Sequence, residues 1–387
     1  MLRLLMTCLL SSPLSLFSAE KIDAVKLREI DGVVEAALKR GDCPGAVVMI
    51  SHRDEIVYQE AFGYSALQPE KKEMALDTVF DLASLTKPIA TASSIFLLVE
   101  QGKLKLSDKV SQHWPEFAAN KKKDITIEQC LLHITGLTAD NAIADYKDGK
   151  EKALEKIANL SLEVEPGTRF RYSDVGFIVL GVMVEKVSKA TVADFARKNL
   201  FEPLKLSDTG YLPTEKIQAR CAPTGQRENR WMIGEVHDPR AAAMGGVAGH
   251  AGLFGTAKDL IRFSQMLLHE GEIDNQKVFQ PATVRLMTSP VEVPGGLRSR
   301  GWDVDTAYSA QRGKIFPKGQ GFGHTGFTGT SIWIDPPSKT VIVILTNRVH
   351  PNEKGNVTQL RREIATIVSL SIPEPPKKES KEKSKNP

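Results

Sequence analysis

The stretch Ser84-Leu85-Thr86-Lys87 sets a serine and a lysine three residues apart at the start of an apolar run. Residues i and i+3 of a helix share one face, so we expect the Ser84 hydroxyl and the Lys87 amine to point into the same space. A serine becomes a good nucleophile when a neighbouring base takes its proton, and a buried lysine with a lowered pKa is such a base. Pro88 follows, and because a helix tolerates proline only in its first turn, it places both side chains near the helix start. The stretch therefore predicts a nucleophile beside its base.

Two further elements follow in chain order. Tyr172-Ser173-Asp174 directly precedes an apolar helical run, and His324-Thr325-Gly326 lies on a predicted strand. A phenol beside Lys87 would have its pKa lowered, so we expect Tyr172 to pass a proton to the leaving group. The alternative for Tyr172 is a buried aromatic of the core. The residues leave open whether Lys87 or Tyr172 removes the serine proton.

This ordered trio resembles the S-x-x-K, Y-x-N and K-T-G elements of the serine β-lactamase and penicillin-binding protein family, most closely its class C-like branch. That branch contains D-alanyl-D-alanine carboxypeptidases, D-aminopeptidases and carboxylesterases. The resemblance covers roughly residues 30–365 and includes FDLA at 80–83, LLHITGL at 131–137, EPL at 202–204 and AGLFGTA at 251–257. It implies an acyl-enzyme at Ser84, an oxyanion held by the backbone N–H groups of Ser84 and Phe327, and no cofactor. It also implies that Gly326 and Phe327 continue the edge strand and that Thr325 and Gly326 bind the substrate.

Two positions depart from the family pattern. Asp174 stands where the family has asparagine, and an ionised carboxylate only accepts hydrogen bonds, so we expect it to pair with Lys87 and orient it. A cap on the following helix is the other role for Asp174. His324 replaces the lysine that attracts a substrate carboxylate, and a histidine is partly charged near neutral pH. We therefore expect acidic substrates to bind less tightly, or only at lower pH; a proton shuttle is the alternative for His324.

Strand-like segments occur at both ends of the chain and helices in the middle. Residues 45–50 and 56–58 flank a polar turn, and residues 330–334 and 340–345 flank another. This order predicts an α+β fold with three α/β/α layers, in which helices flank an antiparallel sheet built from both chain ends and a mostly helical region is inserted. We place the sheet at about 30–80 and 295–370 and the helical region at about 81–294. A closing helix is expected at about 355–370.

The composition and the two ends of the chain limit which classes of function are possible. The 387 residues carry a formal net charge of +4, and leader and tail account for most of it, so no nucleic-acid patch is implied. Residues 1–19 are interpreted as a secretory signal peptide, with a short membrane anchor as the alternative. Residues 20–372 form the predicted hydrolase domain, and the basic tail 373–387 is predicted to be disordered. No membrane span is expected after leader removal, and the sequence does not define an oligomeric state.

Other polar residues give weaker signals. Arg348 follows the last predicted strand and is either a substitute carboxylate receptor or a surface arginine. His237, Asp238 and His250 flank a glycine-rich loop, 245–249, that is expected to border the cleft. Their spacing matches no metal motif, so no metal site is predicted.

The sequence thus predicts a secreted or periplasmic serine hydrolase of a bacterial envelope that acts on a small molecule or a peptidoglycan peptide. A D,D-carboxypeptidase or esterase is favoured, because of Asp174 and His324. The alternatives are a true β-lactamase and a non-catalytic protein that binds wall peptide on the same scaffold.

Overall fold

A nine-stranded antiparallel sheet, in the order β11-β12-β13-β14-β15-β16-β1-β2-β3, organises the computed structural model, which describes residues 21–373. The predicted leader and, except for Pro373, the predicted tail lie outside the described residues. The strands are β1 (Gly45–His52), β2 (Glu55–Ala66), β3 (Lys72–Glu73), β11 (Val291–Val293), β12 (Gly296–Arg298), β13 (Asp303–Asp305), β14 (Phe322–Thr325), β15 (Ser331–Asp335) and β16 (Thr340–Thr346).

The two chain ends meet in the middle of this sheet. The two predicted hairpins are present as β1–β2 and β15–β16. Strand β1 pairs with β16 from Ala46↔Thr346 to His52↔Thr340, so segments almost 300 positions apart form one continuous ladder. The prediction of an antiparallel sheet built from both chain ends is confirmed.

Both faces of the central strands are buried, in two separate cores. Val47 and Met49 of β1 point into the larger core, whereas Val48 and Ile50 point into the smaller one. This alternation follows from the two-residue period of a strand. It also explains why these strands are apolar at almost every position.

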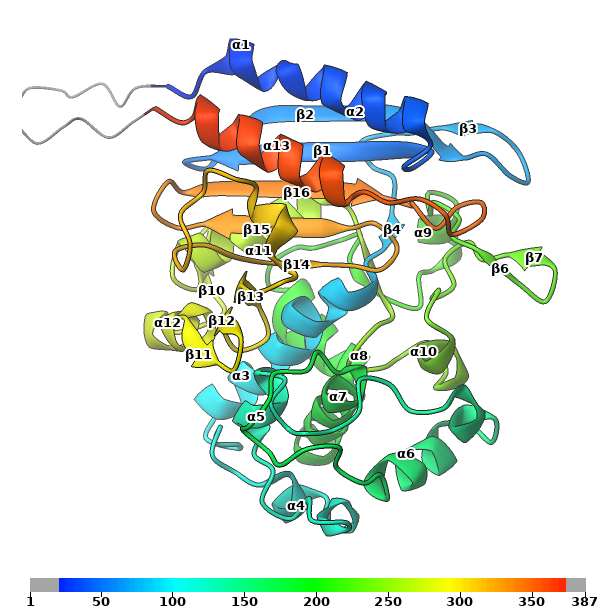
Figure 1. Ribbon diagram of the computed structural model, residues 1–387, viewed down its shortest axis with the longest axis vertical. Helices are drawn as coiled ribbons and strands as arrows, with labels where there is room; N and C mark the ends of the chain where they lie inside the picture. The colour runs from blue at the N-terminus through cyan, green and yellow to red at the C-terminus, as the bar shows by residue number, and fades with distance from the viewer. Residues whose placement is uncertain (1–20, 374–387) are drawn as a thin grey trace, which may run out of the picture.

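Helices cover the sheet on both sides, which confirms the three-layer prediction (Figure 1). Helices α2 (Glu29–Arg40) and α13 (Thr358–Ser371) lie together on one face and enclose the smaller core, with the short α1 (Ala24–Leu27) beside them. Helix α11 (Ala257–Leu268) packs on the other face against β1 and β16.

The inserted region is mainly helical. A 3₁₀ turn η1 (Ala83–Leu85) leads into the π-helical segment η2 (Lys87–Ala92) and then α3 (Ser93–Glu100), which contacts α7 (Asp174–Ser188). The other helices are α4 (Val110–His113), η3 (Pro115–Ala118), α5 (Ile127–Leu131), η4 (Ile143–Tyr146), α6 (Lys150–Ala158), α8 (Val192–Ala196), η5 (Arg197–Phe201), α9 (Glu215–Gln218), α10 (Pro239–Ala243), α12 (Pro281–Thr288) and η6 (Ser309–Arg312). Short strands β4 (Phe80–Asp81), β5 (Gly210–Tyr211), β6 (Gln226–Arg227), β7 (Arg230–Trp231), β8 (Leu253–Gly255), β9 (Glu272–Ile273) and β10 (Gln276–Lys277) connect them.

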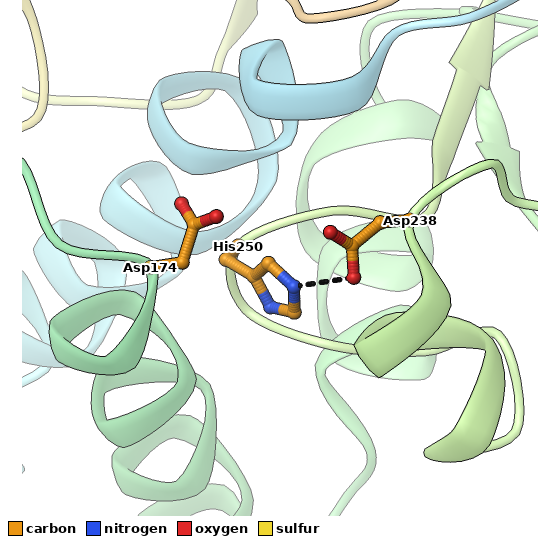
Figure 2. A group of neighbouring side chains, drawn as sticks. All are labelled: Asp174, Asp238 and His250. Carbon is orange, nitrogen blue, oxygen red and sulfur yellow. Dashed lines mark hydrogen bonds and ion pairs between the residues drawn. The ribbon is translucent and has the colours of Figure 1, made fainter. Parts of the chain in front are cut away.

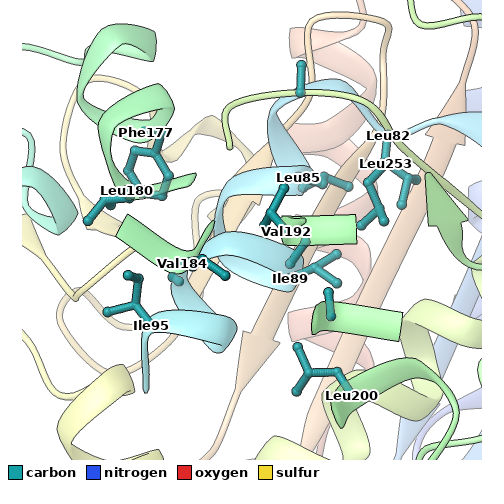
Figure 3. Close-up of a cluster of buried hydrophobic side chains, with 14 of the residues drawn as sticks. Leu82, Leu85, Ile89, Ile95, Phe177, Leu180, Val184, Val192, Leu200 and Leu253 are labelled. Carbon is teal, nitrogen blue, oxygen red and sulfur yellow. The ribbon is translucent and has the colours of Figure 1, made fainter. Parts of the chain in front are cut away.

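The helix that starts at the serine is held in apolar surroundings. Leu85 and Ile89 of this helix lie in one cluster with Phe177 and Leu180 of α7 and with Leu253 of β8 (Figure 3). A helix that is apolar on every side is stable only when it is buried on every side. The cluster therefore fixes the serine turn relative to the rest of the helical region.

Side chains bond to the backbone at the starts of two of these helices. Thr126 and Gln129 form a reciprocal capping box at α5. The predicted cap by Asp174 is wrong, because the Ser173 hydroxyl accepts the Gly176 N–H at the start of α7 and Asp174 is the first helical residue.

Candidate active site

Ser84 lies on a tight turn at the boundary of the sheet layer and the helical region. Ala83, directly before it, has a left-handed backbone with φ of 48°, a conformation that non-glycine residues seldom adopt. The Asp81 carboxylate stabilises this turn by accepting the Ala83 N–H at 2.8 Å, and it also accepts the His237 N–H at 2.7 Å. Asp81 therefore connects the serine turn to the loop that carries His237.

Oxygen atoms of three residues surround the Lys87 ammonium. Lys87 Nζ lies 3.0 Å from Ser84 Oγ, 3.1 Å from the His250 carbonyl oxygen and 2.6 Å from Asp174 Oδ1. Lys87 is fully buried, and burial works to lower its pKa, but the Asp174 carboxylate and Tyr172 outweigh burial and raise the pKa. The predicted pair with Asp174 is present. The expectation of a lowered lysine pKa is wrong, because it ignored this carboxylate.

Tyr172 lies beside the pair, in the segment that precedes α7. Its ring centroid is 4.9 Å from Lys87 Nζ, and the ring stacks on the imidazole of His133 at 4.6 Å. Its hydroxyl is buried and has no hydrogen-bond partner within residues 21–373. Burial raises the pKa of Tyr172 and outweighs the opposing charge of Lys87, so the predicted lowering of the phenol pKa is wrong.

His250 and Asp238 form a second acid–base pair next to Asp174. His250 Nε2 lies 2.9 Å from Asp238 Oδ1, and Figure 2 shows the imidazole between the two carboxylates. One ligand-type atom from each of the three residues falls within 4.8 Å of the others, which is a separation that a metal ion requires. The Lys87 ammonium already lies against Asp174, so a cation is present at this group without a metal. The loop 245–249, which His250 follows directly, contributes no residue to the lining of the cavity beside Ser84, so the expectation that it borders the cleft is wrong.

His324 and Thr325 form the end of β14, and Gly326 follows the strand. Strand β14 pairs with β15 along its length but with β13 only through Gly323, so it is an inner strand whose last residues leave the β13 side unpaired. His324 is buried, and burial together with the charges of Arg298 and Lys87 holds its pKa well below the usual range. The expectation of a partly charged His324 near neutral pH is therefore wrong.

Gly326 and Phe327 form the turn after β14 and do not extend the strand as expected. A Cβ on Gly326 would lie 2.1 Å from Thr330 Oγ1 and 2.5 Å from the Leu82 carbonyl oxygen, so only glycine lets this turn approach the serine turn. Within residues 21–373, the backbone N–H groups of Ser84 and Phe327 have no backbone acceptor. Two such free donors on neighbouring turns can donate hydrogen bonds to an oxyanion as it forms.

A cavity of about 550 Å³ opens beside Ser84. Of the predicted site residues, Ser84, Tyr172, His324, Thr325, Gly326 and Phe327 line it, whereas Lys87 and Asp174 lie behind the wall. The lining includes four basic side chains and one acidic side chain, namely Arg298, Arg348, Lys354, Arg361 and Asp303. The cavity therefore favours an anionic ligand.

Sequence reasoning singled out Arg348 but missed other polar residues. The Arg348 guanidinium donates to the Gly355 carbonyl oxygen at 3.0 Å and lies 4.4 Å from the ring centroid of Phe327, which is 55% exposed. Asp81, Arg298 and Gln311 were not identified. Asp81 could have been found from its place in the FDLA stretch, but no local pattern marks the other two.

Known proteins are similar to this chain over most of its length. The model of the family described as Beta-lactamase matches residues 30–366. A Bacillus subtilis (strain 168) protein named N-acetylmuramyl-L-alanine amidase is 33% identical over 374 residues, 86% of this chain and 84% of the relative. A Salmonella typhimurium (strain LT2) protein, provisionally named D-alanyl-D-alanine carboxypeptidase, is 31% identical over 397 residues, 90% of this chain and 91% of the relative. The structure of EstCE1, a hydrolase with promiscuous acyltransferase activity, has a TM-score of 0.72 and 26% identity, and covers 89% of this chain and 99% of its own.

The three-layer fold and the matching sequence define a serine hydrolase of the β-lactamase and penicillin-binding protein type. The chain belongs to the Beta-lactamase family, as its sequence resemblance predicted. Within residues 21–373, no helix has the length and apolar character that crossing a membrane requires.

Proposed function

We propose that this enzyme hydrolyses an amide bond of a peptidoglycan-derived peptide through an acyl-enzyme at Ser84. The observation that carries the proposal is the 3.0 Å contact between Ser84 Oγ and Lys87 Nζ at the wall of a predominantly basic cavity. The names of the Bacillus and Salmonella relatives both refer to cell-wall amide bonds, which supports this substrate class. The family alone leaves the substrate open, because one fold serves many acyl substrates.

Attack requires Lys87 to accept a proton, although its pKa is raised. In the proposed step, the ammonium gives a proton to Asp174 across their 2.6 Å contact and takes the proton of Ser84. The Ser84 oxygen then bonds to the substrate carbonyl carbon, and the N–H groups of Ser84 and Phe327 hold the resulting oxyanion. Net charge at the site is unchanged, because the Lys87–Asp174 pair retains both protons.

Collapse of this intermediate breaks the carbon–nitrogen bond. The unpartnered hydroxyl of Tyr172 gives its proton to the leaving nitrogen and regains one from Lys87. Water then attacks the acyl-enzyme by the reverse proton path and releases the carboxylic acid. Tyr172 serves as an acid in this scheme, which is consistent with its raised pKa.

Ester hydrolysis is the second candidate. EstCE1, at 26% identity, is a hydrolase with acyltransferase activity, which favours acyl donors other than peptides. Asp174 replaces the asparagine amide that would donate to a substrate amide oxygen, and this also favours esters. For location, we propose export to a bacterial envelope on the basis of residues 1–19, where a peptidoglycan substrate would be met.

The test is incubation of the enzyme and a Ser84→Ala variant with N-acetylmuramyl-L-alanine, a D-alanyl-D-alanine peptide, a short acyl ester and penicillin. Mass spectrometry follows products and covalent adducts. Turnover of either amide with Ser84 required supports the proposal, and turnover of the ester alone supports the second candidate. Efficient opening of penicillin would instead identify a β-lactamase. Equal turnover by Ser84→Ala would refute the assigned nucleophile.

A further inference from the structure

Arg361 of α13 is a buried cation that has no acidic partner within residues 21–373. Its exposed fraction is only 9%. Burial and the nearby charge of Arg348 lower its pKa to about 9, and no carboxylate of the described residues opposes them. A buried charge is costly unless polar groups of the protein compensate for the lost water. The acceptors of the Arg361 guanidinium are therefore the groups on which its charge acts.

These acceptors are two carbonyl oxygens of the turn after β14. Arg361 Nη2 donates to the Thr330 oxygen at 2.8 Å and to the Gly326 oxygen at 3.3 Å. The same two oxygens close the turn, because the Thr330 oxygen accepts the Gly326 N–H at 2.7 Å and the Gly326 oxygen accepts the Gly329 N–H at 3.1 Å. Arg361 thus adds a charged donor to both carbonyl groups that define the shape of the turn.

The Gly326 oxygen belongs to the same peptide group as the Phe327 N–H. This peptide bond is trans, and in a planar trans peptide the C=O and the N–H point in opposite directions. A donor that fixes the direction of the oxygen therefore also fixes the direction of the N–H. A hydrogen bond to the oxygen polarises the peptide group and strengthens its N–H as a donor, and a charged donor does so more than a neutral one.

We propose that Arg361 is a positioning residue of the oxyanion hole, which holds the peptide group between Gly326 and Phe327 so that its N–H points at the charge developing on the substrate. The assignment rests on the proposed acyl-enzyme chemistry at Ser84. Arg361 acts through the peptide group and needs no contact with the substrate. Arg348 does not take this role, because it donates to the Gly355 oxygen and lies against the ring of Phe327.

The first measurement observes the peptide group itself by nuclear magnetic resonance. Phenylalanine labelled with heavy nitrogen is incorporated, and the Phe327 amide signal is assigned by its absence from the spectrum of Phe327→Leu. We expect Arg361→Gln to shift this signal, because the charged donor on the peptide oxygen is lost. The matched control is Arg362→Gln, which removes the next, exposed arginine of α13 and should leave the signal in place. An unchanged Phe327 signal in Arg361→Gln overturns the proposal.

Steady-state kinetics with a short acyl ester supplies the second readout. A whole oxyanion donor is worth about 100- to 1,000-fold in kcat, and a misdirected donor keeps part of that, so we expect Arg361→Gln to lower kcat by about 10-fold with KM unchanged. Arg361→Lys retains the charge without the fork and should lie between the wild type and Arg361→Gln. Arg361 also lines the cavity, so direct contact with the substrate would instead raise KM and keep kcat, which overturns the proposal.

The two readouts can fail separately from the proposed function. If Arg361→Gln does not fold, Arg361→Lys takes its place in both measurements with Arg362→Lys as the control, and an unshifted Phe327 signal then overturns the proposal. Turnover that is equal in the wild type and Arg361→Gln would reject the role of Arg361 and leave the proposed function standing. A wild type that turns over no acyl substrate, but whose Phe327 signal depends on Arg361, would reject the proposed function and keep the link between Arg361 and this peptide group.

Discussion

Lys87 Nζ lies 2.6 Å from Asp174 Oδ1, and this contact joins the start of the serine helix to the first residue of α7. Lys87 is fully buried, so its charge is stable there because the carboxylate compensates the loss of water. The same carboxylate keeps the lysine protonated, which is the opposite of what a base requires. The Ser84 proton can move only if Lys87 first passes one to a neighbour.

The Asp174→Asn variant tests this dependence. Without the carboxylate, Lys87 must lose its proton to solvent, and we expect kcat for a short acyl ester to fall by about 100-fold at pH 7, as for loss of a general base. The residual kcat should rise with pH, because burial then dominates and lowers the pKa of Lys87. The wild-type kcat should be flat between about pH 6 and 8, below the ordinary lysine pKa.

The measurement is a pH–rate profile of both proteins. Asp148→Asn is the control, since Asp148 is an exposed residue between η4 and α6, and it should match the wild type. An Asp174→Asn profile that is parallel to the wild type would show that Asp174 takes no part in proton movement.

Much of the fold could be predicted from the sequence, because the residues of the central strands and of the turns between them mark these strands without reference to distant parts of the chain. The turn at 53–55 and the turn at 335–339 separate strongly apolar segments, and these became β1–β2 and β15–β16. The three-residue strands β11, β12 and β13 could not be predicted in the same way. Their pairing depends on the neighbouring strands more than on their own residues.

The site was predictable where spacing along one helix determines contact, as for Ser84 and Lys87. Charge states were not predictable, because they depend on burial and on partners distant in sequence. Asp174 reversed the expected pKa shift at Lys87, and burial reversed the one at Tyr172. Burial also lowers the pKa of His324, which was expected to be partly charged. Arg298 was missed because it follows a glycine-rich turn that shows no hydrophobic period.

Asp238→Asn is expected to lower stability in a pH-dependent manner. Burial works to raise the pKa of Asp238, but His250 and the Ala241 N–H outweigh it and hold the pKa well below its usual range. A depressed acid pKa gives stability that is present above the unfolded value, about 3.9, and is lost as pH falls through the folded value. Asparagine retains the cap on α10 but replaces the charged oxygen that bonds to His250 by a neutral one.

We therefore expect Asp238→Asn to reduce the free energy of unfolding by about 2 kcal/mol at pH 7, the worth of a charged hydrogen bond. Urea unfolding at pH 7 and at about pH 3, where Asp238 of the unfolded chain is protonated, measures the difference. The deficit should shrink at the lower pH. A deficit of the same size at both pH values would show that the charge of Asp238 is not its source.

Asp81→Asn should remove a part of the pH dependence in which stability falls as pH rises. This is opposite in sign to the contribution of Asp238. Burial raises the pKa of Asp81 to about 6, although the His237 and Ala83 N–H groups oppose it. A raised acid pKa means that the folded state binds the proton more tightly, so stability falls as pH rises from about 4 to 6. The variant should lack this part of the slope.

Activity gives a second readout at Asp81. Asparagine offers one acceptor oxygen for two backbone N–H groups, and one unsatisfied buried group costs about 1–3 kcal/mol. We expect the serine turn to loosen and kcat to fall. Urea unfolding across pH 4–7 together with steady-state kinetics checks both effects. An unchanged pH slope would mean that Asp81 does not titrate in this window.

Gly326→Ala addresses the oxyanion geometry directly. The new Cβ would lie 2.1 Å from Thr330 Oγ1 and 2.5 Å from the Leu82 carbonyl oxygen, and real Cβ atoms do not approach so closely. The turn after β14 must move away from the serine turn, which separates the N–H groups of Phe327 and Ser84. Loss of one oxyanion donor lowers kcat by about 100- to 1,000-fold, and we expect a fall in that range.

A matched glycine separates this effect from a general loss of stability. Gly32 lies in α2, where an added Cβ meets no atom within 4 Å, so Gly32→Ala should leave kcat unchanged. It should also raise the free energy of unfolding by about 0.5–1 kcal/mol, because alanine loses less entropy in a helix. Steady-state kinetics and thermal unfolding of both variants provide the comparison. If Gly326→Ala lost stability but kept its kcat, the Phe327 N–H would not be an oxyanion donor.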